Sequence, residues 1–285
     1  MEVVRISDPK AYLKLVETML LKKEASNNLP LGIVNRIVGS KENAVDQNHP
    51  YFGIVKEKGE AVYAFMQTPP HNLILADVDN LPSSTIQSIA EHLYNEEVML
   101  PGVIGPSRLA QQFVDSWKQL TKVETSIEME QFVYRLDQLI EPPIVEGELV
   151  KASDANSKLI AKWLIAFGEE AHVPTTTEQA EQMAARFIEV QSVYLWKVNG
   201  TYVSMVNQSR KSKHGASINA VYTPNEYKGN GYATASVAEL SKRLLQQGNQ
   251  FCSLFADADN PISNHIYKKM GYRVVSDSTV YNLKS

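Results

Sequence analysis

The sequence is poor in cysteine, carries no excess of basic residues and has no long apolar run. Cys252 is its single cysteine, which excludes an intrachain disulfide and suits a reducing compartment. A formal net charge of -4 argues against the basic footprint of a nucleic-acid-binding protein. The first residues lack a basic-then-apolar signal, and no stretch approaches the length of a membrane-spanning helix. These absences predict a cytoplasmic protein that binds neither nucleic acid nor a membrane.

The chain does contain enough apolar material for two cores. Its 285 residues, 44% of them hydrophobic, have the length of two domains of ordinary size. Two prolines and a glycine lie among acidic residues at 141–147, a composition typical of a domain boundary. We therefore predict one domain over residues 1–140 and a second over residues 141–285.

Both halves show the same order of predicted elements. Each begins with two helical patterns, and each continues with a hairpin whose turn is Lys58-Gly59 in the first half and Asn199-Gly200 in the second. A central strand, a helix, a strand, a helix and further strand follow in both. The repeat predicts tandem copies of one α/β (α+β) unit. The predicted elements lie near 8–23, 28–38, 51–55, 61–66, 72–76, 83–96, 102–105, 107–120 and 126–136, then near 154–171, 177–190, 193–198, 201–206, 217–222, 251–256, 272–275 and 279–283. Two further helices of the second half are predicted, one that Gly248 closes and one that begins at Asn260 and ends at Gly271.

A glycine-broken turn follows the central strand of the second half. The strand covers residues 217–222, and the turn at 228–231 leads into an amphipathic helical pattern that Gly248 closes. A strand, a glycine turn and a helix in this order direct unpaired backbone N–H groups and the positive end of a helix dipole at one place. Glycine also lets a ligand approach the backbone closely. The junction therefore predicts a site for a phosphate-bearing ligand.

A second segment carries polar side chains along one helical face. Asn260 and Pro261 fit the cap and first residue of a short helix that Gly271 ends. Asn260, Ser263 or Asn264, and Tyr267 recur at spacings of three, four and seven, so they share one face. On its own, Tyr267 could equally be a half-buried packing residue, and Cys252 is most simply a buried small side chain.

Together the two segments resemble the GCN5-related N-acetyltransferase family. Lys228, Gly231 and Ala233 stand where the family signature has Arg or Gln, then Gly, then Gly or Ala. Residues 260–272 are similar to the family's coenzyme A binding and acid-bearing segment, and both segments occur in the family's order and spacing. Lys228 departs from the signature, but the loop acts mainly through backbone N–H groups. The motifs cover residues 217–283, and the likeness of fold extends back to about residue 148.

The resemblance implies a fold in which each half is a mixed, mostly antiparallel twisted sheet flanked by helices. It also implies that acetyl-coenzyme A, without a metal, gives its acetyl group to a primary amine by direct attack in a ternary complex. Tyr267 would be the acid that protonates the departing thiolate. The residues implied to bind the cosubstrate are Val221, Tyr222, Lys228, Gly229, Asn230, Gly231, Tyr232, Ala233, Thr234, Asn260, Ser263 and Asn264.

Several alternatives stay open at the level of function. The acceptor is a small-molecule or peptide amine, and the sequence leaves the acyl length and a homodimer undecided. Asn219 occupies the strand where the family often places a carboxylate base, whereas Glu169, Glu170 and His172 lie in the segment that commonly borders the acceptor. The missing carboxylate suggests a non-catalytic coenzyme A sensor or partner-binding module as a rival. A transferase of a longer acyl group, or a mononucleotide-phosphate protein with the same loop, would also contain the turn.

The first half lacks the glycine turn. Its central strand is followed by acidic and amide residues and then by Leu81-Pro82-Ser83-Ser84, where Pro82 has no N–H to donate. Residues 107–122 likewise contain no Asn-then-Tyr pair at the spacing of the second half. We expect this degenerate copy not to bind coenzyme A, and to pack against the second domain as one wall of the acceptor cleft.

Overall fold

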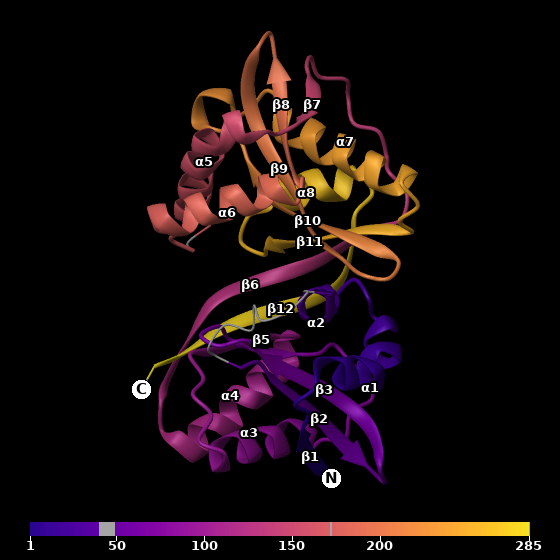
Figure 1. Cartoon of the computed structure of the whole chain (residues 1–285), viewed down its shortest axis with the longest axis vertical. Coiled ribbons are helices and arrows are strands. Elements are labelled where there is room, and N and C mark those ends of the chain that lie inside the picture. The colour runs from indigo at the N-terminus through magenta and orange to yellow at the C-terminus, as the bar shows by residue number, and fades with distance from the viewer. Residues whose placement is uncertain (40–48, 172, 285) are drawn as a thin grey trace. The chain divides into compact units, whose positions relative to one another are not determined.

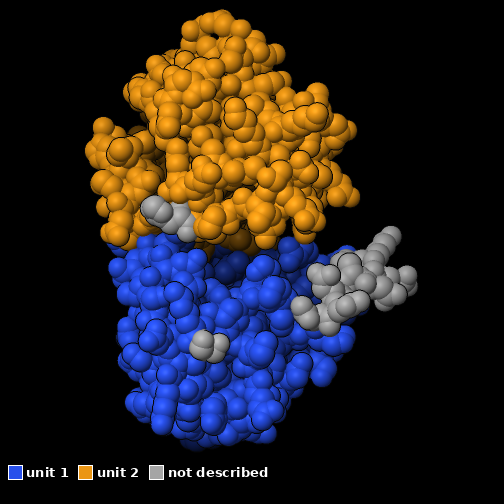
Figure 2. Space-filling view, turned by 90° about the vertical axis from the view of Figure 1, so that its left-hand side faces the viewer, with its two compact units in different colours: residues 1–133, 274–285 blue, residues 134–273 orange. Residues whose placement is uncertain are grey.

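The computed structural model describes residues 1–39, 49–171 and 173–284, and it confirms the predicted fold class (Figure 1). The chain forms two compact units, residues 1–133 with 274–285 and residues 134–273 (Figure 2). These units do not coincide with the predicted ranges 1–140 and 141–285. The difference arises because the last strand pairs within the first unit.

The first unit is a sheet covered by helices. Its strands run in the order β1-β2-β3-β4-β5-β12, followed by β6, and only the β4–β5 pair among the first five is parallel. The elements are β1 (Glu2–Arg5), α1 (Pro9–Leu21), α2 (Asn28–Gly39), β2 (Tyr51–Glu57), β3 (Glu60–Gln67), β4 (Leu73–Leu75), α3 (Thr85–Asn95), β5 (Gly102–Gly105), α4 (Ser107–Thr121), β6 (Glu124–Leu136) and β12 (Arg273–Lys284).

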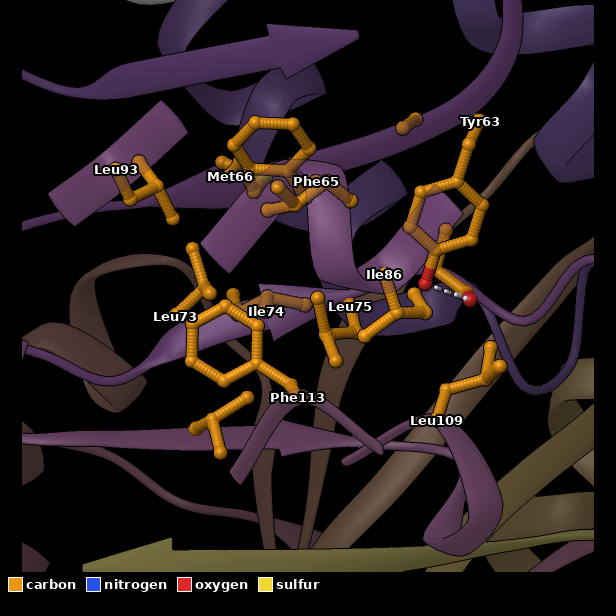
Figure 3. Close-up of a cluster of buried hydrophobic side chains, with 14 of the residues drawn as sticks. Tyr63, Phe65, Met66, Leu73, Ile74, Leu75, Ile86, Leu93, Leu109 and Phe113 are labelled. Atoms are coloured by element: carbon orange, nitrogen blue, oxygen red, sulfur yellow. Dashed lines mark hydrogen bonds between the residues drawn. The ribbon is translucent and has the colours of Figure 1, made fainter. Parts of the chain in front are cut away.

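The core of this unit lies between its central strands and helices. Figure 3 shows apolar side chains of β3 and β4, such as Phe65 and Leu73, among side chains of α3 and α4, such as Ile86 and Phe113. Tyr63 is fully buried, and its hydroxyl donates to the carbonyl oxygen of Ala76 at 2.8 Å. Burial of these apolar groups stabilises the unit by removing them from water.

The second unit has the same plan. Its strands run in the order β7-β8-β9-β10-β11, with the end of β6 beside β11, and β10 and β11 are parallel. The elements are β7 (Glu148–Lys151), η1 (Asp154–Asn156), α5 (Ser157–Glu170), α6 (Thr177–Glu189), β8 (Val193–Val198), β9 (Thr201–Lys211), β10 (Gly215–Tyr222), η2 (Asn225–Tyr227), α7 (Tyr232–Gln246), β11 (Phe251–Asp257) and α8 (Pro261–Lys269).

Local sequence explains the turns and caps. Both residues of each predicted hairpin turn have positive φ, with 52° and 88° at Lys58 and Gly59 and 48° and 83° at Asn199 and Gly200. Such turns match the twist of the strands that they join. Asn260 caps α8, since its side chain accepts the N–H of Ser263 at 3.1 Å. The predicted hairpins and the start of α8 are therefore confirmed.

The predicted final pair of strands, 272–275 and 279–283, is wrong. A single strand, β12, covers both segments. The polar residues between them resemble a turn in the sequence, yet Ser276 donates to Asp77 and Asp277 accepts the N–H of Ser107 in the structure. β12 lies between β5 and β6 in the sheet, so its backbone stays extended where the sequence suggested a turn. The four-residue strands β1 and β7 were missed, because such short runs show no clear period.

Candidate functional site

The predicted phosphate loop lies between β10 and α7. Gly229 and Gly231 have φ values of 82° and 80°, a conformation that L side chains rarely adopt. The first intrahelical bond of α7 runs from the N–H of Ala235 to the oxygen of Gly231, and no side chain caps the helix. The N–H groups of residues 232–234 therefore lack an acceptor in their own helix. They form a cradle for an anion at the positive end of the α7 dipole.

The side chain of Asn230 holds this loop in shape. Its Nδ2 donates to the carbonyl oxygens of Tyr227 at 3.0 Å and Lys228 at 3.3 Å. Residues 228–231 are exposed, and residues 232–234 are half-buried, so an anion can reach the backbone from solvent. The loop thus combines accessible donors with a fixed geometry.

Two features of β10 open a path beside the loop. Ala220 has a φ of 48°, and the register with β9 shifts between Asn219 and Tyr222, which is a β-bulge. A bulge leaves residues outside the ladder, and here Ala220 and Val221 have no partner in the register with β9. The parallel register of β10 with β11 ends at Ser217 and Ser253. Within the described residues, 218–222 and 254–257 are not paired with each other, so the strands diverge toward the loop.

The polar face of α8 divides into two kinds of residue. Asn264 is 7% exposed, and its Nδ2 donates to the carbonyl oxygens of Asp257 at 2.9 Å and Ala258 at 3.2 Å. Its Oδ1 accepts the hydroxyl of Tyr134 at 2.9 Å. Asn264 therefore ties α8 to the end of β11. Asn260 is exposed, and its Nδ2 has no partner among the described residues, so this amide can bind a ligand. Ser263 bonds the oxygen of Asn260 at 3.2 Å.

Tyr267 is a buried side chain whose hydroxyl has no hydrogen-bond partner among the described residues. The residue is 9% exposed, and burial, together with Tyr134, raises its pKa to about 12. No hydrogen-bond partner of the hydroxyl exists among the described residues, yet none of their buried side-chain oxygens or nitrogens lacks a partner. The hydroxyl therefore keeps at least a small exposed surface. A protonated phenol with a free hydrogen can donate to an incoming group.

A carboxylate faces the loop from α5. The Oε1 of Glu170 lies 2.7 Å from the Nζ of Lys228, and both side chains are about half exposed. Burial, followed by the charges of Glu170, Glu226 and Glu169, raises the pKa of Tyr222. Three carboxylates thus gather near the end of β10. His172, the third residue that the sequence suggested beside the acceptor, lies outside the described residues.

A cavity of about 400 Å³ adjoins the loop. One wall is the segment before β7, which contributes Pro142, Pro143 and Val145, and a Cβ on Gly231 would stand 3.1 Å from Val145. The composition of this segment predicted only a domain boundary. Its place beside the loop depends on contacts about 85 residues apart, for which the sequence carries no local signal. The remaining lining residues are Glu141, Gly231, Thr234, His265, Ile266, Lys269 and Met270.

Cys252 is fully buried, and burial raises the pKa of its thiol to about 12, so it remains a protonated thiol at neutral pH. The described residues contain no group of three or more side chains suited to a metal ion. None of the helices in the described ranges combines the length and apolar character that a bilayer crossing needs.

The first unit has different chemistry after its central strand. There the Nζ of Lys23 lies 2.9 Å from the Oδ1 of Asp77 and 2.6 Å from the Oδ1 of Asp79. These residues line a cavity of about 500 Å³ together with Pro82 and its neighbours. Paired carboxylates stand where the second unit has exposed amides, and carboxylates repel a phosphate.

The family model described as FR47-like protein matches residues 198–281, which include the loop, the diverging strands and α8. A search of curated proteins finds no match.

Solved structures of similar fold cover almost the whole chain. An acetyltransferase of the GNAT family from Colwellia psychrerythraea matches with a TM-score of 0.60 at 10% identity, over 100% of both chains. A GCN5-related N-acetyltransferase from Sphaerobacter thermophilus has a TM-score of 0.62 at 13% identity, over 98% of this chain and 94% of that one. A tandem GNAT protein from the clavulanic acid biosynthesis pathway has a TM-score of 0.59 at 13% identity, over 98% and 97%. The resemblance inferred from the two motifs is confirmed at the level of fold.

Proposed function

We propose that the chain is a member of the GCN5-related N-acetyltransferase family, whose fold it shares, and that its second unit transfers an acetyl group from acetyl-coenzyme A to a primary amine. The acceptor is a small molecule or a peptide amine. The observation that carries the proposal is that the amide cradle at the start of α7 and helix α8, which carries Tyr267, line one cavity.

The residues of the second unit fit acetyl-coenzyme A. The amides of residues 232–234 bind the pyrophosphate, and the positive φ values of Gly229 and Gly231 keep the backbone free of side chains there. The cavity beside Gly231 takes the nucleoside end, with an apolar wall of prolines and with Lys269 near its rim. Asn260 donates to the pantetheine arm, while Asn264 holds the helix in place.

The cosubstrate supplies an acyl group on a thioester, and the protein supplies position and protons. The freed backbone N–H near Val221 donates to the carbonyl oxygen of the thioester and stabilises the negative charge that develops there. Tyr267 holds a proton on its phenolic oxygen and gives it to the departing sulfur. Its raised pKa makes the proton hard to release, so this transfer depends on close approach to the sulfur.

Carboxylates near the end of β10 serve the acceptor. An amine arrives mostly as an ammonium ion and must lose a proton before it attacks. Glu170 and Glu169 attract that cation, and Glu170 is the base that we propose, directly or through a water molecule. Phosphate on the loop competes for Lys228 and so releases Glu170 from its ion pair.

The protonated state of Cys252 supports direct attack by the amine. A cysteine that carries the acetyl group first would need a thiolate, whereas burial keeps this thiol protonated.

In the first unit, Asp77 and Asp79 disfavour phosphate, and we propose that this copy does not bind coenzyme A.

A second candidate function rests on Asn219. Asn219 lies on the central strand, where a carboxylate base is expected, and its side chain is an amide. Its Oδ1 accepts a hydrogen bond from Asn207 at 2.8 Å. A chain without a working base would bind coenzyme A as a sensor and leave the thioester intact.

Two measurements separate these functions. Calorimetry with acetyl-coenzyme A tests binding, and release of free thiol in the presence of a panel of primary amines tests turnover. Binding with thiol release supports the transferase, and binding without release for every amine supports the sensor. Absence of heat at millimolar acetyl-coenzyme A rejects both. Mass spectrometry of co-purified acyl-coenzyme A then distinguishes acetyl from longer acyl groups.

A further inference from the structure

Tyr134 is a buried tyrosine that the proposed mechanism does not yet use. It lies near the end of β6, a strand that begins in the first unit and ends in the second. The side chain is 0% exposed. A buried phenol hydroxyl lowers stability unless it makes a well-formed hydrogen bond. The hydroxyl of Tyr134 makes such a bond to Asn264, 130 positions further along the chain.

Its contacts converge on α8. The hydroxyl of Tyr134 donates to the Oδ1 of Asn264, whose amide group is anchored on the end of β11. The ring of Tyr134 lies 5.8 Å from the ring of Tyr267, with the two planes tilted by 54°. Tyr134 thus touches the proposed acid through its ring and holds the same helix through its hydroxyl.

The other side of Tyr267 is also occupied. The ring of Tyr272 lies 5.9 Å away in an edge-on arrangement, and its hydroxyl bonds Ser241 at 2.8 Å. Rings on two sides restrict the rotation of the Tyr267 side chain. The orientation of the Tyr267 ring, and with it the position of its hydroxyl, is then restricted.

We infer that Tyr134 is a positioning residue for the proposed acid, which aims the hydroxyl of Tyr267 through its ring and through Asn264. This inference rests on the proposed function. A hydroxyl that must approach a departing sulfur closely gains from such a support, because small misplacements of a reacting group lower the rate strongly. The strand that connects the two halves of the chain thereby completes the site of the second half.

A double-mutant cycle tests the inference. Tyr134→Phe keeps the ring and removes the hydrogen bond to Asn264, and we expect kcat to fall about tenfold, equal to ~1.4 kcal/mol, with the KM for acetyl-coenzyme A unchanged. Tyr267→Phe removes the proton itself. If Tyr134 acts through Tyr267, the double variant is no slower than Tyr267→Phe alone. Multiplied effects in the double variant would overturn the inference.

Tyr63→Phe is the matched control. Tyr63 is another fully buried tyrosine with one backbone hydrogen bond, and it lies in the core of the first unit. Its variant should lose similar stability yet keep the wild-type kcat. If Tyr63→Phe slows turnover as much as Tyr134→Phe does, the effect reports general stability, and the positioning role is rejected.

A readout without catalysis separates this inference from the proposed function. Hydrogen exchange of the α8 amides, residues 262–269, should be faster in Tyr134→Phe than in the wild type and unchanged in Tyr63→Phe. Unchanged exchange in Tyr134→Phe would overturn the positioning role. A wild-type protein that releases no thiol would instead refute the proposed transferase, while the exchange result still decides whether Tyr134 orders α8.

Discussion

Two glycines at the ends of α7, Gly231 and Gly248, allow the proposed phosphate site to be tested by substitution. Gly231 combines a φ of 80° with a position at the start of α7, where a side chain would meet Val145 and the incoming phosphate. Gly248 ends the same helix with a φ of 96° and has nothing within 4 Å of an added Cβ. Both glycines therefore need a positive φ, but only Gly231 lies where the proposed phosphate would bind.

We predict that Gly231→Val weakens the binding of acetyl-coenzyme A by about 100-fold or more, equal to ~2.8 kcal/mol. The branched side chain blocks the approach of phosphate to the amides and strains the backbone. Calorimetry measures the change. Gly248→Val carries similar strain and should bind normally, so an unaltered affinity in Gly231→Val would contradict the phosphate role of the loop.

The acid role of Tyr267 makes two predictions. Tyr267→Phe should lower kcat by about 100-fold and leave the affinity for acetyl-coenzyme A nearly unchanged, since a general acid contributes roughly 100-fold or more. Because its pKa is about 12 rather than the ordinary value, Tyr267 stays protonated well above pH 10. The wild-type kcat should therefore show no fall between pH 8 and pH 10. A decline centred near pH 10, or full activity in the variant, would argue against this acid.

At the scale of elements, β12 shows how a remote strand completes a core. Thr279 through Asn282 pair antiparallel with Gly105 through Gly102 of β5. Tyr281 and Leu283 belong to the buried cluster of the first unit. Asp277 also accepts the N–H of Ser107 at 3.0 Å, which satisfies a free amide at the start of α4.

We predict that Leu283→Ala lowers the free energy of unfolding of the first unit by about 2–5 kcal/mol. The residue is 8% exposed, and its loss leaves a cavity against the core. Hydrogen exchange of β5 and α4 amides locates the effect. Val274→Ala on the same strand is the control, because Val274 is 44% exposed and its truncation should cost at most about 0.5 kcal/mol. Equal effects of both variants would contradict the packing role of the strand's end.

Across the whole molecule, buried tyrosines link stability to alkaline pH. Burial raises the pKa of Tyr63, Tyr267 and Tyr272 above their ordinary value, so the fold favours the neutral phenols. Their contribution is fully present below pH 10, where the unfolded chain also holds these protons, and it is lost as pH rises toward the folded pKa values. Tyr267 alone accounts for about 2–3 kcal/mol, at roughly 1.36 kcal/mol for each unit of pKa.

We predict that the free energy of unfolding is nearly constant from pH 7 to pH 9 and falls steadily above pH 10. Urea denaturation at a series of pH values measures it. Tyr63→Phe removes one ionising group and should flatten the alkaline loss. A stability that rises above pH 10 would contradict the buried, neutral state of these phenols.

Local chemistry made much of this protein readable from its sequence. The turn at Asn199-Gly200, the glycine conformations at 229 and 231 and the cap at Asn260 depend on residues within a few positions of one another. Their propensities and hydrogen bonds are therefore written in short segments. The tandem order of elements was readable for the same reason, because each half repeats its own periodic pattern.

Only the tertiary structure decided which distant segments complete each unit and the site. It joined two predicted strands into β12, placed Tyr134 against Tyr267 and paired Glu170 with Lys228. These contacts connect residues tens to hundreds of positions apart, and neither partner carries a local signal of the other. Burial and hydrogen-bond satisfaction select such partners in the folded state, where buried backbone groups and buried hydroxyls must all find hydrogen-bond partners at once.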